Sequence, residues 1–394
     1  MDKKEEVEEQ KKTNWWLPIG LVILLVVFIG GLSWWQQNKT PKTNIKIGVI
    51  APLTGVAALY GQGSLDMINM AVEEINKAGG IDGRNLSVVA EDGKCQADQA
   101  VIAANKLIQT DKVKFILGGH CSSETAIIAP ILDKNKVFGL AGVSTAPGIL
   151  DKYSYVFRTS PSSSDQSAQI AQLAYNTYNL KTIATITEQT AYAKGITDDF
   201  IKDFVALGGT IIDSEEYASG QAGFQTELTK IKAAKPDALF VSPQGQPTAI
   251  EIAKEIKTLN ITGTLLGNSV FVGKTVYAQS GNALPDGTFT VAPYANLTSK
   301  NTAALISKYN AKYGKDIPYN NFFVGAAYDG VYMLKNALVK CGEDSTCVKD
   351  YFSSIKDYNG SVATFSFKSN GDADINNWYE LKLVGGKEVY SKVQ

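Results

Sequence analysis

Two short polar segments contain residue types that suit the binding of an anion. Residues 118–125 (GGHCSSET) stand where an apolar run ends and a helical pattern begins, and residues 142–147 (GVSTAP) repeat this layout after the next apolar run. Small residues and hydroxyl groups there leave backbone N–H groups free, and the helix dipole attracts negative charge. Each segment alone is also compatible with ordinary N-capping. Two of them at neighbouring strand ends favour a shared site for a carboxylate or an amide.

His120 is the single histidine of the chain. One imidazole nearly excludes His-rich metal sites, and it leaves one candidate base for Ser-His or Cys-His catalysis. Neither a G-x-S-x-G motif nor a phosphate-binding P-loop occurs in the sequence, so there is no positive signal for an enzyme. We expect no catalytic residue, no metal and no cofactor. His120 is then either a structural histidine or a contact to a ligand.

Two further motifs are weak. Gly61 and Gly63 follow the first apolar run, but a dinucleotide-binding fingerprint requires a third glycine where Asp66 stands. A glycine-bearing loop leading into a helix is the simpler interpretation. Residues 372–376 (DADIN) faintly resemble a calcium loop, yet they lack the turn glycine and the final glutamate at the required offsets. A hairpin turn is the better interpretation there.

Strand and helix patterns alternate along most of the chain and must position these segments. The predicted strands are residues 45–51, 86–91, 114–119, 137–142, 182–187, 209–217, 237–242 and 263–268, and the predicted helices are residues 64–78, 96–109, 122–134, 193–207, 224–234 and 248–259. This alternation predicts an α/β fold with two doubly wound, Rossmann-like lobes. Ligands of such folds bind outside the carboxyl ends of the strands, so facing lobes would hold a ligand in the cleft between them.

The last third of the chain has a different pattern. Residues 300–313, 321–340 and 344–354 are predicted helices, and residues 361–367 and 378–384 are predicted strands joined by a polar connection. A chain that ends in helices and then returns to strands is expected to cross back between the lobes.

The charge balance excludes one class of partner. Lysine plus arginine number 38 and aspartate plus glutamate 39, so the net charge is −1. Duplex nucleic-acid binders normally carry a basic excess, so we expect no nucleic-acid partner.

One apolar segment has the length of a membrane span. Residues 17–35 (LPIGLVILLVVFIGGLSWW) contain no charge, and tryptophans bracket the run at both ends. About 20 apolar residues cross a bilayer as a helix, and tryptophans favour its interfaces. A cleaved signal peptide is the alternative, although no A-x-A-like site follows. We expect a single-pass anchor at residues 17–35, a cytoplasmic tail at residues 1–16 and a linker at residues 36–44.

The cysteine content bears on the compartment. Cys95, Cys121, Cys341 and Cys347 form an even set without a C-x-x-C motif. Two disulfides in an oxidising compartment fit this set, and buried free thiols are the alternative. We therefore expect the residues after the anchor to lie outside the cytoplasm, at the cell membrane.

From Ile45 onward, the sequence resembles the Leu/Ile/Val-type (branched-chain amino acid family) extracytoplasmic solute-binding proteins of ABC transporters, with the type I periplasmic binding fold. The resemblance rests on the ordered segments IKIGVIAPLTG, YGQG, AVEEINKAGGIDGRNL, EDGKC, GGHCSSETA, VSTAP, FRTSPSSSDQ, AYDG and FKSNGDADI. It covers essentially the whole globular part. It implies two lobes joined by a three-segment hinge, with residues 45–162 and 294–360 in lobe 1 and residues 163–293 and 361–394 in lobe 2.

The resemblance also implies which residues bind the ligand. Ser122 matches a serine that binds the ligand carboxylate, and Thr145 matches a threonine that binds the ligand at both its carboxylate and ammonium ends. The other positions expected at the ligand are Tyr60, His120, Val143, Ser144, Ser163, Tyr192, Ser269 and Phe323. The resemblance pairs Cys95 with Cys121, and we also expect a disulfide between Cys341 and Cys347.

Two positions depart from the amino-acid binders of this family. Those proteins hold the ligand ammonium with carboxylates, where this chain has Ser163 and Ser269. A serine accepts a hydrogen bond but brings no charge, and charge-assisted hydrogen bonds are roughly twice as strong. Glu188, close to Tyr192 in the sequence, is a possible substitute. The ligand is therefore either an amino acid held differently, or an amide, a urea-like compound or an organic acid.

These observations lead to one functional hypothesis and two alternatives. We expect a membrane-tethered solute-binding protein, without enzymatic activity, that closes around a small polar metabolite and delivers it to the permease of an ABC importer. A sensory binding module that signals to a membrane partner is the first alternative, and an amidase-type enzyme is the second. The partners expected are thus a small-molecule ligand, an ABC permease and the membrane.

Overall fold

The computed structural model describes residues 43–296, 299–318, 321–375 and 377–393. The predicted anchor at residues 17–35, the tail before it and most of the linker lie outside the described residues. Among the described residues, no helix is both long and apolar enough to cross a membrane.

The first sheet is parallel and has the strand order β2-β1-β3-β4-β5. Its strands are β1 (Ile45–Ala51), β2 (Leu86–Asp92), β3 (Phe115–Gly118), β4 (Phe138–Ala141) and β5 (Val156–Arg158). The helices that accompany it are α2 (Ala58–Lys77), α3 (Ala97–Asn105), the π-helical turn η1 (Lys106–Thr110), α4 (Ser122–Lys134), α10 (Lys300–Tyr313), α11 (Asn321–Cys341) and α12 (Ser345–Ser353). The strand order reverses between β1 and β3, which creates a switch point at their carboxyl ends.

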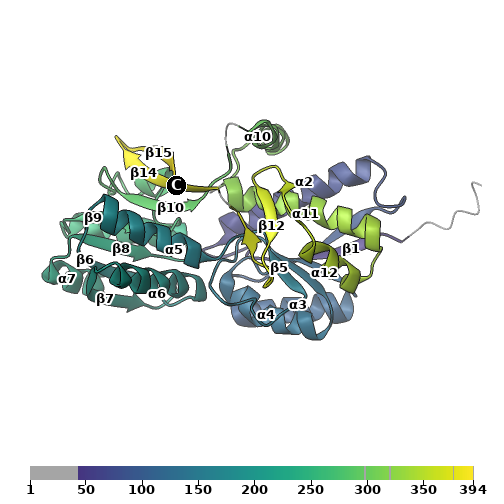
Figure 1. Cartoon of the computed structure of the whole chain (residues 1–394), viewed down its shortest axis with the longest axis horizontal. Helices are drawn as coiled ribbons and strands as arrows, with labels where there is room; N and C mark the ends of the chain where they lie inside the picture. Colours follow the sequence, from purple (N-terminus) through teal and green to yellow (C-terminus); the bar gives the residue numbers. More distant parts are fainter. Residues whose placement is uncertain (1–42, 297–298, 319–320, 376, 394) are drawn as a thin grey trace, which may run out of the picture. The chain divides into compact units, whose positions relative to one another are not determined.

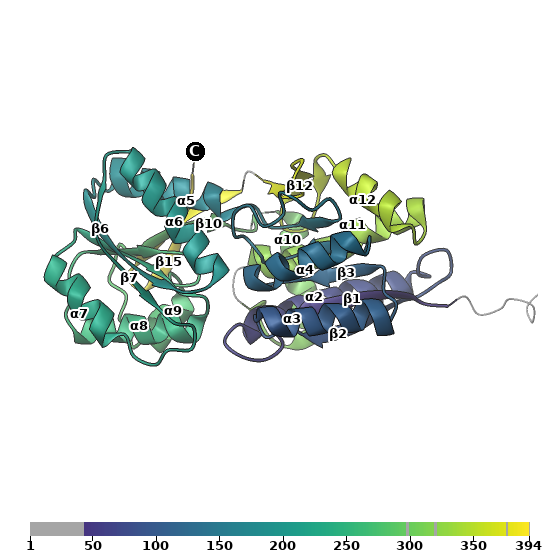
Figure 2. The same cartoon turned by 90° about the horizontal axis from the view of Figure 1, so that it is seen from below.

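Side chains that alternate along β1 separate the two faces of this sheet. Ile47 and Val49 pack in one core with α2, α10, α11 and α12, whereas Ile50 packs in another with α3 and α4. Successive strand residues point to opposite faces, so an almost uninterrupted apolar strand must be covered on both sides. Figure 2 shows α3 and α4 together over the sheet.

The second sheet has the order β15-β14-β10-β9-β8-β6-β7. Its strands are β6 (Thr182–Glu188), β7 (Thr210–Tyr217), β8 (Ala238–Ser242), β9 (Thr264–Gly267), β10 (Phe289–Pro293), β14 (Trp378–Val384) and β15 (Lys387–Lys392). Its helices are α5 (Ser163–Gln172), the π-helical turn η2 (Leu173–Thr177), α6 (Ala191–Ala206), α7 (Gln225–Ala234), α8 (Gln246–Thr258) and α9 (Lys274–Gln279). Strands β6 to β10 are parallel to one another. Strands β14 and β15 are antiparallel and extend the sheet beside β10 (Figure 1).

The end of the chain corrects the sequence-based expectation. A small antiparallel sheet, made of β11 (Tyr358–Asn359), β12 (Thr364–Phe367) and β13 (Ala373–Asp374), packs Phe365 and Phe367 into the core of the first sheet. Residues 361–374 therefore lie with lobe 1, although we expected them in lobe 2. The predicted strands at 361–367 and 378–384 belong to different sheets, so their connection is a crossing segment and not a hairpin turn between them.

Helix α2 begins earlier than its apolar pattern indicated. Gly61 and Gly63 lie inside the helix and not in a preceding loop. A Cβ at Gly61 would stand 2.1 Å from the carbonyl oxygen of Pro52, and one at Gly63 would stand 2.5 Å from Cγ of Pro318. These glycines let the first turns of α2 pack closely against two loops, which accounts for them without a nucleotide.

Candidate functional site

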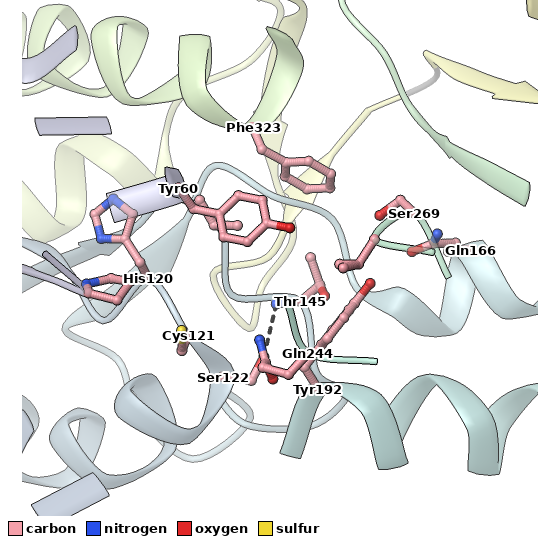
Figure 3. Close-up of a pocket in the computed structure, with 13 residues that line it drawn as sticks. Tyr60, His120, Cys121, Ser122, Thr145, Gln166, Tyr192, Gln244, Ser269 and Phe323 are labelled. Carbon is pink, nitrogen blue, oxygen red and sulfur yellow. Dashed lines mark hydrogen bonds between the residues drawn. The ribbon is translucent and has the colours of Figure 1, made fainter. Parts of the chain in front are cut away.

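The carboxyl ends of strands from both sheets line one cavity of about 490 Å³, part of it open to solvent. Pro52 follows β1, His120 and Ser122 follow β3, and Tyr192, Gln244 and Ser269 follow β6, β8 and β9. The full lining is Pro52, Tyr60, His120, Cys121, Ser122, Val143, Thr145, Gln166, Tyr192, Gln244, Ser269, Val270 and Phe323 (Figure 3). The cavity thus lies where the doubly wound topology predicts a ligand.

Ser122 is held at the wall of this cavity by backbone hydrogen bonds. It is the first residue of α4, and its Oγ accepts a hydrogen bond from the backbone N–H of Thr145 at 3.2 Å (Figure 3). The same oxygen accepts the N–H of Ala146 at 3.1 Å. A third contact joins Ser122 Oγ to the Ser144 hydroxyl at 3.4 Å. The Ser122 hydroxyl therefore connects the start of α4 to the segment that carries Thr145, at the wall of the cavity.

Thr145 adds a second hydroxyl to the same wall. Its side chain is 4% exposed, and its Oγ1 has no hydrogen-bond partner among the described residues. Its carbonyl accepts the N–H of Ser163 at 2.7 Å, which joins the segment to the start of α5. A buried polar atom without a protein partner indicates a place for a ligand or water.

A buried arginine holds the segment that carries Thr145. Arg158 is fully buried, and its Nη1 donates to the carbonyl oxygens of Ser144 at 3.3 Å and Ala146 at 2.8 Å. Its Nε forms an ion pair with Asp372 Oδ1 at 2.7 Å. Arg158 therefore connects the ligand wall to the crossing segment near β13.

Glu124 stabilises the start of α4 from the other side. Its carboxylate accepts the N–H of Cys121 at 3.0 Å and the N–H of Cys95 at 2.9 Å. Burial raises the pKa of Glu124 to about 7, against the opposing effect of these hydrogen bonds. A Cβ at Gly93 would lie 2.2 Å from the Glu124 Oε1, so only glycine permits this close approach. A carboxylate near ionisation thus lies at the same helix end as Ser122.

His120 is buried and neutral. Its Nδ1 donates to the Ile50 carbonyl at 3.0 Å, and burial lowers its pKa to about 4. Its Nε2 has no partner among the described residues and is therefore an acceptor. The ring also borders a second, smaller cavity of about 240 Å³ that is walled by Ile68, Leu117 and Gly142 among others. Among the described residues, no hydroxyl or thiol is hydrogen-bonded to His120 Nε2.

The second wall of the cavity is polar but uncharged. The Tyr192 hydroxyl is hydrogen-bonded to Ser269, and burial raises the Tyr192 pKa, so the phenol stays protonated. Gln166 and Gln244 contribute amides, and Val270 an apolar surface. None of the lining residues that the structure describes is Asp, Glu, Lys or Arg. The cavity therefore offers hydrogen bonds without a countercharge for an ammonium group.

Most of the ligand residues expected from the sequence meet at this cavity. Tyr60, His120, Ser122, Val143, Thr145, Tyr192, Ser269 and Phe323 line it. Ser144 and Ser163 are not among the lining residues: the Ser144 hydroxyl contacts Ser122 Oγ at 3.4 Å, and Ser163 Oγ is buried without a hydrogen-bond partner among the described residues. The Ser163 N–H donates to the Thr145 carbonyl at 2.7 Å, so Ser163 is joined to the cavity wall through its backbone.

Glu188 does not supply a carboxylate to the cavity. Its Oε2 accepts the backbone N–H of Gln244 at 2.8 Å, and its Oε1 accepts the Ser219 hydroxyl at 2.7 Å. It positions the Gln244 backbone and is absent from the described lining. Glu188 therefore does not line the cavity in this structure, and its role as a substitute carboxylate stays a prediction.

Several lining residues were missed by the sequence reasoning. Gln244 and Val270 directly follow strands that the sequence predicted, so the strand-end rule could have found them. Gln166 stands one helical turn after Ser163, inside a segment that carries the family resemblance. Because Gln166 lies on a helix, the strand-end rule does not identify it, and its inward direction is visible only in the structure.

The expected disulfides are both formed. Cys95 and Cys121 are bonded with a Cα–Cα distance of 5.3 Å, and Cys341 and Cys347 with one of 5.6 Å. The first attaches the segment after β2 to the N-terminal end of α4, next to Ser122.

Comparison with known proteins places this geometry in context. Residues 44–387 match the family described as "Periplasmic binding protein". The chain is 28% identical over 349 residues to the Leu/Ile/Val-binding protein BraC3 of Rhizobium johnstonii, covering 88% of this chain and 93% of that protein.

Two solved structures share the fold. The branched-chain amino acid transporter substrate-binding protein LivJ of Streptococcus pneumoniae, in complex with isoleucine, is 27% identical, with a TM-score of 0.79 over 89% of this chain and 99% of that one. A solute-binding protein of an ABC transporter from Rhodopseudomonas palustris, in complex with 3,4-dihydroxybenzoic acid, is 25% identical, with a TM-score of 0.76 over 88% of this chain and 95% of that one. One of these binds an amino acid and the other an acid without an amino group.

Proposed function

The chain belongs to the periplasmic binding protein family, and from this premise we propose how its cavity is used. It is a solute-binding protein of an ABC transporter and not an enzyme. In our proposal it captures a small metabolite that bears a carboxylate, or its amide, and no ammonium group. Ser122 and Thr145 hold the carboxylate, and Tyr60, Tyr192 and Phe323 surround the rest of the ligand.

The observation that carries this proposal is the uncharged second wall. An ammonium buried beside Gln166, Tyr192 and Ser269 would lose its water without gaining a countercharge. A carboxylate on the first wall finds the Ser122 hydroxyl, the Thr145 hydroxyl and the end of α4. Glu188 could have supplied the charge, but it is engaged with Gln244 and Ser219.

Capture follows from the two-walled cavity. A ligand that contacts residues of both sheets binds the closed arrangement more tightly than an open one, and that difference shifts the population. We further propose that residues 17–35 tether the protein to the membrane, so that the ligand is delivered outside the cytoplasm to the permease.

A thermal-shift screen over amino acids, their 2-oxo and deaminated acids, and aliphatic amides tests this proposal. Each compound that binds the folded state raises the melting temperature by mass action. We expect shifts from carboxylates without an ammonium group or from amides. Shifts confined to amino acids would overturn the proposed ligand class.

A further inference from the structure

A hydrogen bond fixes the orientation of the side-chain amide of Gln166. It lies on α5, is 2% exposed, and lines the cavity next to Ser269 (Figure 3). Its amide nitrogen Nε2 donates to the Val291 carbonyl in β10 at 2.6 Å. A carbonyl oxygen only accepts hydrogen bonds, so the atom facing Val291 must be the nitrogen. The amide oxygen Oε1 therefore points away from Val291, on the cavity side.

The acceptor atom Oε1 restricts which chemical groups of a ligand can lie against Gln166. The Oε1 lone pairs attract an O–H or N–H group and repel a carbonyl oxygen. A neutral hydroxyl satisfies Oε1 without the desolvation cost that a buried, uncompensated ammonium carries. A carbonyl in the same place would leave Gln166 without a donor, and a buried acceptor that loses its partner costs free energy.

We propose that Gln166 is the specificity-determining residue of the second wall, and that its Oε1 accepts a hydrogen bond from a hydroxyl group of the ligand. This rests on the proposed function, in which Ser122 and Thr145 hold the ligand carboxylate. The chain then selects hydroxy carboxylic acids over the matching acids that lack the hydroxyl or carry an oxo group. The Ser269 hydroxyl, which is hydrogen-bonded to Tyr192, lies next to Gln166.

Isothermal titration calorimetry with matched pairs tests this selectivity. One pair is 2-hydroxy-4-methylpentanoate and 4-methyl-2-oxopentanoate, which places the hydroxyl beside the carboxylate. The other is 4-hydroxybenzoate and benzoate, which places it across a ring. In at least one pair we expect the hydroxy acid to bind about tenfold more tightly, as one hydrogen bond of ordinary strength provides.

Variants assign the preference to Gln166. Gln166→Met keeps the length of the side chain and removes the acceptor, so the hydroxy acid should lose its advantage while the other member of the pair keeps its affinity within about threefold. Gln172→Met, an exposed position at the end of the same helix, is the matched control and should keep the preference. A preference that survives in Gln166→Met overturns the proposal.

The outcomes separate this inference from the proposed function. If none of the four acids binds but another carboxylate or an amide does, the selectivity assigned to Gln166 is overturned; if no carboxylate and no amide binds, the proposed function itself fails. If the acids bind but neither pair shows a preference, only the assignment to Gln166 fails. Should Gln166→Met unfold because Val291 loses its donor, the wild-type comparison decides: equal affinities overturn the proposal and a tenfold preference supports it.

Discussion

The hydroxyl oxygen of Ser122 lies 3.1 Å from the backbone nitrogen of Ala146, across the gap between two neighbouring strand ends. This contact joins the two polar segments that the sequence singled out, so that the segments hold each other. Ser122 is 1% exposed and Thr145 is 4% exposed. Both residues are thus buried in the cavity wall, and the contacts of Ser122 make it part of the folded structure as well as of the expected ligand site.

Ser122→Ala should therefore weaken both ligand binding and folding. The N–H groups of Thr145 and Ala146 lose their acceptor, and the ligand loses a donor, so each quantity should fall by about 1–3 kcal/mol. Calorimetric titration and denaturant unfolding measure the two effects. Ser123→Ala is the matched control, because its hydroxyl bonds to the Cys95 carbonyl and lies outside the cavity. Unchanged affinity in Ser122→Ala would show that the binding wall is misplaced.

Arg158→Met should lower the free energy of unfolding more than the substitution of a partly exposed arginine does. The Arg158–Asp372 pair is buried, and removing one partner of such a pair costs about 3–5 kcal/mol because a charge is left without compensation. The control is Arg84→Met, whose partner Glu343 is partly exposed, and there we expect a loss of at most about 1 kcal/mol. Urea unfolding of both variants checks this. Equal losses would mean that Arg158 does not hold the Thr145 segment as described.

Carboxylate binding should weaken as the pH rises through about 7. Burial raises the Glu124 pKa to about 7, so its ionisation adds negative charge at the end of α4 where the ligand carboxylate binds. Asp92, the nearest carboxylate named among the causes of this shift, is already ionised and adds a constant repulsion. Affinity measured from pH 5.5 to 8.5 should fall in the wild type and stay level in Glu124→Gln. A level wild-type profile would contradict this role.

The free energy of unfolding should increase with pH because of His120, whereas the carboxylate affinity should decrease with pH. Its pKa falls from 6.5 to about 4 on folding, so the unfolded state binds the proton more tightly. Stability from this group therefore rises with pH between about 4 and 6.5, by about 3 kcal/mol in total. In His120→Leu that rise should disappear, which leaves the variant less sensitive to acid than the wild type. Unfolding free energies at pH 4.5 and 7, compared between the two proteins, measure the difference, and parallel profiles would contradict it.

The two disulfides should contribute unequally. The Cys95–Cys121 bond has a sequence separation of 26 and the Cys341–Cys347 bond one of 6. In the chain-entropy model, the first stabilises by about 3–4 kcal/mol and the second by about 2 kcal/mol. Unfolding of the paired Cys→Ala variants tests this order. Four free thiols, found by mass mapping under non-reducing conditions, would contradict both disulfides.

Much of this fold could be predicted because its strands are short apolar runs that alternate with helices. Ile45–Ala51 and Ser122–Lys134 lie as expected, since buried parallel strands and helix starts leave clear sequence patterns. A return of the chain between the lobes was expected, but its position could not be predicted, because the strand at Thr364–Phe367 pairs with two-residue partners that no local pattern reveals. Tertiary pairing, and not propensity, decides which sheet such a strand joins.

The site was predictable where a residue stands at a strand end, and less so elsewhere. Ser122 and Thr145 follow from their segments, but Gln166 faces the cavity from the first turn of a helix, and only its bond to Val291 reveals its direction. Likewise, the role of Glu188 could not be inferred from its position at the end of β6, because its partners Ser219 and Gln244 come from distant segments.

The most direct test of the account is the affinity of leucine relative to 4-methyl-2-oxopentanoate and 4-methylpentanamide, measured by titration calorimetry on the same protein sample. The uncharged wall of Gln166, Tyr192 and Ser269 predicts that the oxo acid or the amide binds at least as well as leucine, or within about tenfold of it. If leucine binds a hundredfold more tightly than both, a carboxylate compensates its ammonium in the bound state, and the central claim of an uncharged site is wrong.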